Sequence, residues 1–121
     1  MQFNSNKAIY LQISDMICEK IMLRQFPEEE RIPSVREMAV QLEVNPNTVM
    51  RTYELLQTLQ IIYNKRGVGF FVAKDGEQKA FDYRKEEFLA NELHIFMKTA
   101  VLLGIKNDEL LAYYEQFKSS K

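Results

Sequence analysis

The chain contains 121 residues, of which 46% are hydrophobic and 27% charged, and its formal net charge is −1. This length suits one compact domain with a small appendage, and the hydrophobic share excludes a chain that is disordered throughout. The single cysteine, Cys18, excludes an internal disulfide and is typical of a reducing compartment. Residues 1–7 lack the apolar core of a signal peptide, and the apolar runs are far shorter than the ~20 residues that span a bilayer. We therefore expect a cytoplasmic protein that does not enter a membrane.

Charge is distributed unevenly along the chain. Residues 31–74 contain six basic and three acidic side chains, a local charge of +3, and acidic residues elsewhere hide this excess in the total. A protein that binds nucleic acid needs a local positive face rather than a basic chain as a whole. This segment is therefore the first candidate for a surface that binds DNA.

Two helices are predicted in the first third of the chain. Residues 7–25 place apolar side chains at helical spacing, and Pro27 follows them. After an acidic loop at residues 28–30, Ser34 and Glu37 have the spacing of a capping box, so the second helix should begin there. The apolar face of this second helix comprises Val35, Met38, Ala39 and Leu42.

A tight turn at residues 43–46 leads to a third helix. Asn45 can cap this helix, and Pro46 then takes its first position, where the missing N–H costs nothing. The buried stripe is predicted at Val49, Thr52 or Tyr53, Leu56 and Leu59. The outward row is predicted to contain Asn47, Thr48, Met50, Arg51 and Glu54. Asparagine pairs with adenine and arginine with guanine or phosphate, so this row suits DNA.

Two short strands are predicted next, at residues 61–64 and 70–73. The segment between them contains Gly67 and Gly69, which allow a turn with positive φ, and Lys65 and Arg66 then lie at its tip. Helix, turn, helix and basic hairpin in this order predict a winged helix-turn-helix, a mainly α (α+β) fold. Such a fold places one helix in the major groove of DNA.

Residues 74–79 are predicted as a polar linker, so we place the DNA-binding domain at residues 1–75 and a helical tail at residues 76–121. The tail should contain one helix over residues 81–103, which ends at Gly104, and another from residue 107. Two helices alone bury little surface, so they must pack on the rest of the chain or on a second copy. We predict a dimer interface that contains Phe88, Phe96, Leu103, Leu110, Tyr114 and Phe117.

Residues 31–72 contain four short motifs in order. The first is Ile32-Pro33-Ser34-Val35-Arg36, and the pair Met38-Ala39 follows. Residues 44–49 form a turn that ends in Val-x-x-x-Thr-Val, and residues 67–72 read Gly-x-Gly-x-Phe-Val. In this order the motifs resemble the DNA-binding segment of the GntR family of bacterial transcription regulators, whose pattern begins with Leu/Ile-Pro-Ser-x-Arg and a Leu/Met-Ala pair. The turn sequence Asn-Pro-Asn-Thr-Val and the short tail resemble the YtrA subfamily, whose members are dimeric repressors, often of transporter operons.

The resemblance implies DNA contacts from the second helix, the third helix and the wing. The implied contact residues are Ser34, Arg36, Asn45, Asn47, Thr48, Arg51, Lys65, Arg66 and Gly67. Pro46 stands where many family members carry an arginine that contacts a base, so base contacts here should come from Asn47, Arg51 or Arg36. The resemblance also implies a homodimeric repressor on a palindromic operator, so the expected partners are double-stranded DNA and a second copy.

Each candidate residue has a structural alternative. Arg36 could be a solvated helix charge, and Arg51 could pair with Glu54 on the same helix. His94 is expected on a helix face or at the dimer seam, because no second histidine or cysteine pair completes a metal site. Cys18 is expected in the core.

A small-molecule effector could bind between the tail helices, but no residue marks such a site. We expect no cofactor and no metal.

Two functional hypotheses remain. The sequence contains no nucleophile elbow, no phosphate-binding loop before a helix and no carboxylate pair beside a histidine, so we predict that the protein is not an enzyme. The first hypothesis is a DNA-binding transcription regulator. The alternative is a winged-helix protein-interaction module without DNA binding. The outward asparagine and arginines favour the first, because a protein-interaction surface would present apolar residues there.

Overall fold

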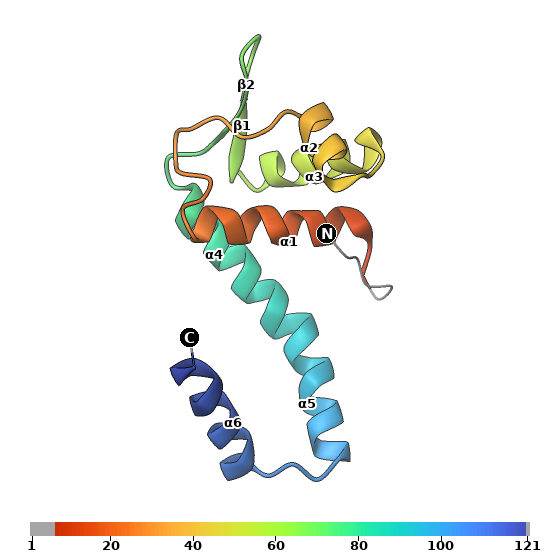
Figure 1. The fold of residues 1–121 in the computed structure, drawn as a ribbon, viewed down its shortest axis with the longest axis vertical. Helices are drawn as coiled ribbons and strands as arrows, with labels where there is room; N and C mark the ends of the chain where they lie inside the picture. The colour runs from red at the N-terminus through yellow and green to blue at the C-terminus, as the bar shows by residue number, and fades with distance from the viewer. Residues whose placement is uncertain (1–6, 121) are drawn as a thin grey trace. The chain divides into compact units, whose positions relative to one another are not determined.

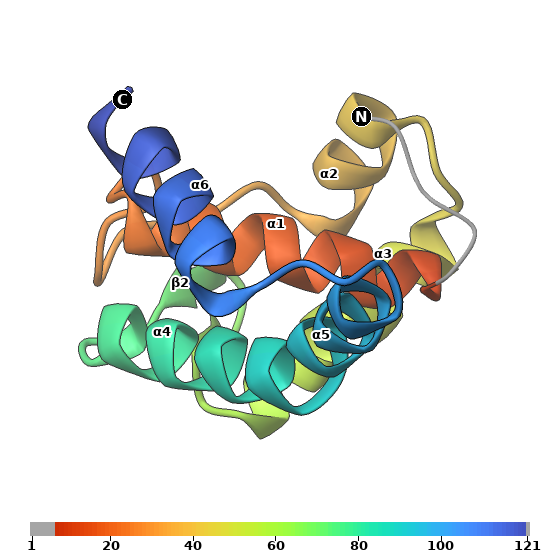
Figure 2. The same cartoon turned by 90° about the horizontal axis from the view of Figure 1, so that it is seen from below.

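A computed structural model of the chain describes residues 7–120. The chain forms two compact units, Met1–Arg84 and Lys85–Lys121. Within the described residues of the first unit lie α1 (Ile9–Met22), α2 (Val35–Leu42), α3 (Pro46–Thr58), β1 (Ile62–Lys65), β2 (Gly69–Val72) and most of α4 (Gly76–Glu87). Both α1 and α2 pack against α3 (Figures 1 and 2), and the hairpin of β1 and β2 projects from this group (Figure 1). The predicted mainly α winged helix-turn-helix is confirmed.

The core of the first unit is formed by apolar side chains from the helices, the hairpin and the segments that join them. The largest fully buried side chains are Tyr53, Ile13, Ile17, Ile21, Ile32, Met38, Leu56, Ile61, Ile62, Val49, Val72 and Thr52. The third helix contributes Val49, Thr52, Tyr53 and Leu56 to this core, as its periodicity predicted. Both alternatives for its second buried position, Thr52 and Tyr53, are therefore correct.

The first helix ends earlier than predicted. It stops at Met22, and Arg24 adopts a left-handed conformation with φ 60°, so the helix terminates before Pro27. The backbone N–H groups of Gln25 and Phe26 then donate to the carbonyl of Lys20, which folds the chain back over the end of the helix. The termination is therefore a left-handed cap, and Pro27 only follows it.

Both predicted caps of the helix-turn-helix are present. The hydroxyl of Ser34 accepts a hydrogen bond from the backbone of Glu37, and the Glu37 carboxylate accepts one from the backbone of Ser34. Asn45 caps α3 through its side chain, and Pro46 occupies the first turn of the helix. The tight turn between the helices is made possible by Glu43, which is left-handed with φ 56°. These local interactions fix where α2 and α3 begin.

The hairpin is antiparallel, and its strands lie one residue from the predicted positions. Ile62 pairs with Val72, and Lys65 pairs with Gly69. Arg31 adds an isolated antiparallel bridge to Phe71, so the segment before α2 runs beside β2. The hairpin is thereby attached to the chain that leads into the helix-turn-helix.

The predicted linker at residues 74–79 is wrong, because α4 begins at Gly76. Gly76 and Ala80 are buried, whereas the residues around them are largely exposed to solvent. The polar composition of these exposed residues led to the prediction of a linker. A Cβ at Gly76 would lie 2.7 Å from Cγ1 of Val72 and 2.9 Å from the carbonyl oxygen of Ile61. The absence of a side chain there allows α4 to start directly against the end of the hairpin.

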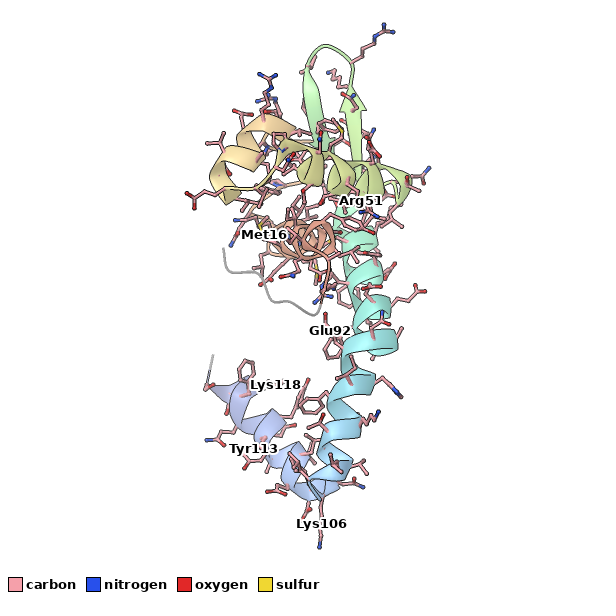
Figure 3. All side chains as sticks on the ribbon, turned by 90° about the vertical axis from the view of Figure 1, so that its right-hand side faces the viewer. Met16, Arg51, Glu92, Lys106, Tyr113 and Lys118 are labelled. Atoms are coloured by element: carbon pink, nitrogen blue, oxygen red, sulfur yellow. The ribbon has the colours of Figure 1, made fainter. Side chains whose placement is uncertain are left out.

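Within its described residues, the second unit contains helices as its only regular secondary structure. After the end of α4 come a π-helical turn η1 (Phe88–Glu92), α5 (Leu93–Leu102) and α6 (Asn107–Ser119). Gly104, with φ 69°, follows the end of α5, and α6 begins at the predicted residue. Lys106 marks the connection between α5 and α6, and Tyr113 and Lys118 lie along α6 (Figure 3). In the described part of the chain, no helix combines the length and the apolar character needed to cross a membrane.

Candidate nucleic-acid interface

Tyr53 connects the three parts of the chain that carry the predicted contact residues. Its hydroxyl donates a 2.6 Å hydrogen bond to the carbonyl of Pro33, immediately before α2. Its ring meets the ring of Phe70 edge to face, with centroids 4.9 Å apart, which joins α3 to β2. Burial raises the pKa of the Tyr53 hydroxyl, so this group remains a donor. The start of α2, the third helix and the wing therefore form one connected structure.

At the start of α2, the two predicted contact residues differ in their roles. Ser34 is half-buried and its Oγ is already the acceptor of the capping hydrogen bond, 3.1 Å from the backbone nitrogen of Glu37. Arg36 lies in the first turn of α2 with an exposed side chain. Because guanidinium groups donate to phosphates and to guanine, Arg36 is the residue of α2 best suited to touch DNA.

At the start of α3, as at the start of α2, one predicted contact residue caps the helix and another has an exposed side chain. The Oδ1 atom of Asn45 accepts a 2.8 Å hydrogen bond from the backbone of Asn47, so Asn45 shapes the turn. Asn47 is exposed, Thr48 is half-buried, and Met50 is 41% exposed beside them. The first turns of α3 therefore present one amide, one hydroxyl and one apolar side chain, which are groups able to contact base edges.

Arg51 does not form the ion pair with Glu54 that was one of its two predicted alternatives, and it lies over an aromatic ring instead. Its guanidinium lies over the ring of Tyr10, 3.9 Å from the ring centroid, and Tyr10 belongs to the first turn of α1. Among the described residues, the ion pairs do not include one between Arg51 and Glu54. Arg51 remains exposed, and Figure 3 shows where its side chain lies on the first unit.

The wing carries two basic residues with different surroundings. Lys65 is the last residue of β1, and its ammonium lies 5.7 Å from the centroid of the Phe71 ring, over the face of the hairpin. Arg66 and Gly67 are exposed in the loop itself, where Gly67 has φ 78°. A hydrogen bond of 2.9 Å from the backbone of Val68 to the carbonyl of Lys65 closes the loop. Arg66 is therefore the basic residue at the tip.

The structure adds Arg31 to the basic residues of this surface. Its guanidinium lies 3.7 Å from the Glu37 carboxylate, and its side chain crosses β2 at Gly69. A Cβ at Gly69 would lie 2.7 Å from Nε of Arg31, and Gly69 has φ 144°. Glycine at this position therefore leaves room for the arginine. The basic count of residues 31–74 included Arg31, but no local pattern places it against the wing.

Cys18 lies in the core, as predicted, and His94 lies on a helix face, which is one of its two predicted positions. Cys18 is fully buried, and burial, together with the nearby Asp15 carboxylate, raises its pKa to about 12, so its thiol stays protonated. His94 is exposed on α5. Within the part of the chain that the structure describes, no three histidine, cysteine or carboxylate side chains are grouped in a way that could hold a metal ion.

The second unit presents an apolar groove. The groove has a volume of about 1040 Å³ and lies between α6 and the segment from η1 to α5. Its lining is dominated by apolar side chains, which include Phe88, Leu93, Phe96, Met97, Leu110, Leu111, Tyr113, Tyr114 and Phe117. Five of the six residues predicted for the dimer interface line this groove, and Leu103, 68% exposed, does not.

Comparisons with known proteins agree with the geometry of the first unit. The sequence pattern of the family "Bacterial regulatory proteins, gntR family" matches residues 9–72, more than half of the chain. The HTH-type transcriptional regulator YhcF of Bacillus subtilis is 39% identical over 96% of this chain and 94% of its own length. The HTH-type transcriptional repressor YtrA of the same organism is 33% identical over 95% of this chain and 88% of its own.

A solved structure supports the same assignment along nearly the whole chain. A crystal structure of a GntR-family transcriptional regulator from Bacteroides thetaiotaomicron superposes with a TM-score of 0.71 at 50% identity, over 94% of this chain and all of that one. These matches extend through both units, and the two Bacillus relatives are named as HTH-type transcription regulators. This chain belongs to the GntR family of bacterial transcription regulators and carries its DNA-binding winged helix-turn-helix.

Proposed function

We propose that this regulator is a homodimeric repressor that binds a palindromic operator. The observation that carries the proposal is the exposed row on α3, with Asn47 and Arg51, on a winged helix whose loop presents Arg66. Polar and basic side chains of this kind hydrogen-bond to base edges and phosphates. Arg36, exposed in the first turn of α2, provides a further guanidinium for a base or a phosphate.

Dimerisation through the second unit is supported by its exposed apolar surface. Among the described residues of this unit, Ala100 alone is buried, whereas Phe96, Leu103, Tyr114 and Phe117 are all more than half exposed. Apolar surface of this extent on a soluble protein marks an interface. A second copy is the occupant that we propose, because one recognition helix spans few base pairs and a two-fold dimer doubles the sequence that is recognised.

The dimer would place each α3 in the major groove of one half-site, with half-site centres about one helical turn apart. The wings would contact the flanking groove or the backbone. A dimer bound over a promoter would block transcription, and the relative YtrA carries the name of a repressor. Repression and the two-fold operator are therefore the proposed mode of action.

A gel shift tests the proposed function directly. The purified full chain is titrated against its own promoter-proximal DNA over a salt series, with a scrambled duplex as competitor. Selective binding that weakens as salt rises supports the proposal, because the released counterions make phosphate contacts salt-dependent. Equal binding to both duplexes, or none, would favour the alternative of a winged-helix protein-interaction module.

Replacing Arg36 with alanine should weaken operator binding by about 1–3 kcal/mol and relax selectivity at one base pair. The reason is the loss of a guanidinium that donates to a base or to its flanking phosphate. Arg24→Ala is the matched control, because Arg24 is exposed at the end of α1 and pairs with Glu77. An Arg36→Ala protein with the control's affinity would remove Arg36 from the interface.

Replacing Arg66 with alanine should make the dependence of binding on salt shallower by about one unit of the logarithmic slope, because one phosphate contact is lost. Arg66→Lys keeps the charge at the wing tip and should retain the slope of the unmodified protein. Both variants are measured by gel shift at several salt concentrations. Equal slopes for Arg66→Ala and Arg66→Lys would contradict a phosphate contact at the wing tip.

A further inference from the structure

The first turn of α1 lies directly against the DNA-facing part of α3. The hydroxyl of Thr52 donates a 2.7 Å hydrogen bond to the backbone carbonyl of Tyr10, so the two helices are joined one residue away from Arg51. Next to this hydrogen bond, the Arg51 guanidinium lies over the Tyr10 ring, 3.9 Å from the ring centroid. The contact between Arg51 and Tyr10 therefore lies directly beside this hydrogen bond between the two helices.

The start of α1 is held in place by side chains rather than by an ordinary N-cap. Ala8 precedes the helix and offers no side-chain cap, but the Gln12 amide donates a 2.7 Å hydrogen bond to the carbonyl of Lys7. The Lys7 ammonium in turn pairs with the Asp15 carboxylate. Gln12 is buried, so its hydrogen bond to Lys7 belongs to the packed interior of the first unit. Together with the Lys7–Asp15 ion pair, this hydrogen bond holds the first turn of α1, which carries Tyr10.

A guanidinium stacked on an aromatic ring keeps its hydrogen-bonding edge available. Its five N–H donors lie in its own plane, whereas the ring covers only one face. Unsupported arginine side chains sample many rotamers, and ordering one of them on binding DNA costs conformational entropy. A ring under the guanidinium removes part of that cost before DNA arrives.

We propose that Tyr10 is a positioning residue that orients Arg51 for its contact with DNA. The proposal rests on the proposed contact between Arg51 and the operator, and it adds a residue of α1 to the machinery of recognition. The side chain of Tyr10 acts through Arg51, so its effect on binding exists only while Arg51 is present.

The test is a double-mutant cycle on the full chain, measured by gel shift on the promoter-proximal duplex. Tyr10→Leu should weaken binding about 2- to 30-fold, the range expected for loss of a cation–π contact. The same change in the Arg51→Ala background should have no further effect. Tyr10→Phe keeps the ring and should bind like the unmodified chain.

The outcomes separate this proposal from the proposed function. If the unmodified chain binds selectively and Arg51→Ala weakens binding, but Tyr10→Leu costs the same in both backgrounds, Tyr10 has a structural role only and the positioning role is refuted. If Arg51→Ala leaves binding unchanged, there is no contact to orient and the proposal also fails. An unmodified chain without selective binding would instead refute the proposed function. Thermal unfolding of each variant identifies losses that come from unfolding.

Discussion

Removal of residues 85–121 should leave a folded winged-helix unit that is monomeric and binds the operator about 10²- to 10⁴-fold more weakly than the full chain. The size of this loss follows from effective concentration, because two linked DNA-binding units bind the second half-site as an intramolecular event. Sedimentation of the truncated protein reports its oligomeric state, and a gel shift on the promoter-proximal duplex reports its affinity.

The position of the cut matters for this experiment. The first unit extends to Arg84, and the part of α4 within it contributes the buried Ala80 and a half-buried Tyr83 that packs against the core. Arg84 also lies 3.6 Å from the Asp15 carboxylate of α1. A cut at residue 81 would remove Tyr83 and Arg84 and destabilise the unit, so a loss of binding would then have two explanations.

Point variants of the tail provide the matched control. Phe96→Glu with Phe117→Glu places charges on the exposed apolar surface and should yield monomers with the same weak binding as the truncated chain. Glu115→Lys alters an exposed polar position of α6 and should leave the dimer intact. A truncated chain that still sediments as a dimer would show that the tail is not the interface.

The features that could be predicted from the sequence are those that depend on neighbouring residues. The capping box at Ser34 and Glu37 and the cap by Asn45 were predictable because each joins residues two or three positions apart. The same applies to the hairpin, whose glycines mark the turn, although its first strand was predicted one residue early and its second strand one residue late. Burial of the α3 stripe followed from helical periodicity.

The features that were missed depend on contacts between distant parts of the chain. The polar composition of residues 74–79 suggested a linker because only Gly76 in this stretch is buried, and nothing in the local sequence indicates the hairpin against which it packs. The position of Arg51 over Tyr10 depends on how α1 packs on α3. Similarly, Arg31 reaches Gly69 only because β2 runs beside the segment before α2.

Replacing Tyr53 with alanine should lower the free energy of unfolding by about 3–5 kcal/mol, the range for truncating a large aromatic side chain in a core. Tyr53 is fully buried, so the truncation leaves a cavity beside Phe70 and removes the donor to the carbonyl of Pro33. Natural domains are stable by only about 5–15 kcal/mol, so this variant should be near its unfolding threshold. Urea denaturation followed by circular dichroism measures the change.

Tyr53→Phe separates the two contributions of this side chain. It keeps the edge-to-face contact with Phe70 and loses only the hydrogen bond to Pro33, so it should cost about 0.5–1.5 kcal/mol, with a further penalty if the carbonyl stays unsatisfied. A loss for Tyr53→Ala no larger than that for Tyr53→Phe would mean that the ring does not hold the wing to α3. Because this ring joins α2, α3 and the wing, Tyr53→Ala should also reduce operator affinity at urea concentrations where the chain remains folded, whereas Tyr53→Phe should retain most of it.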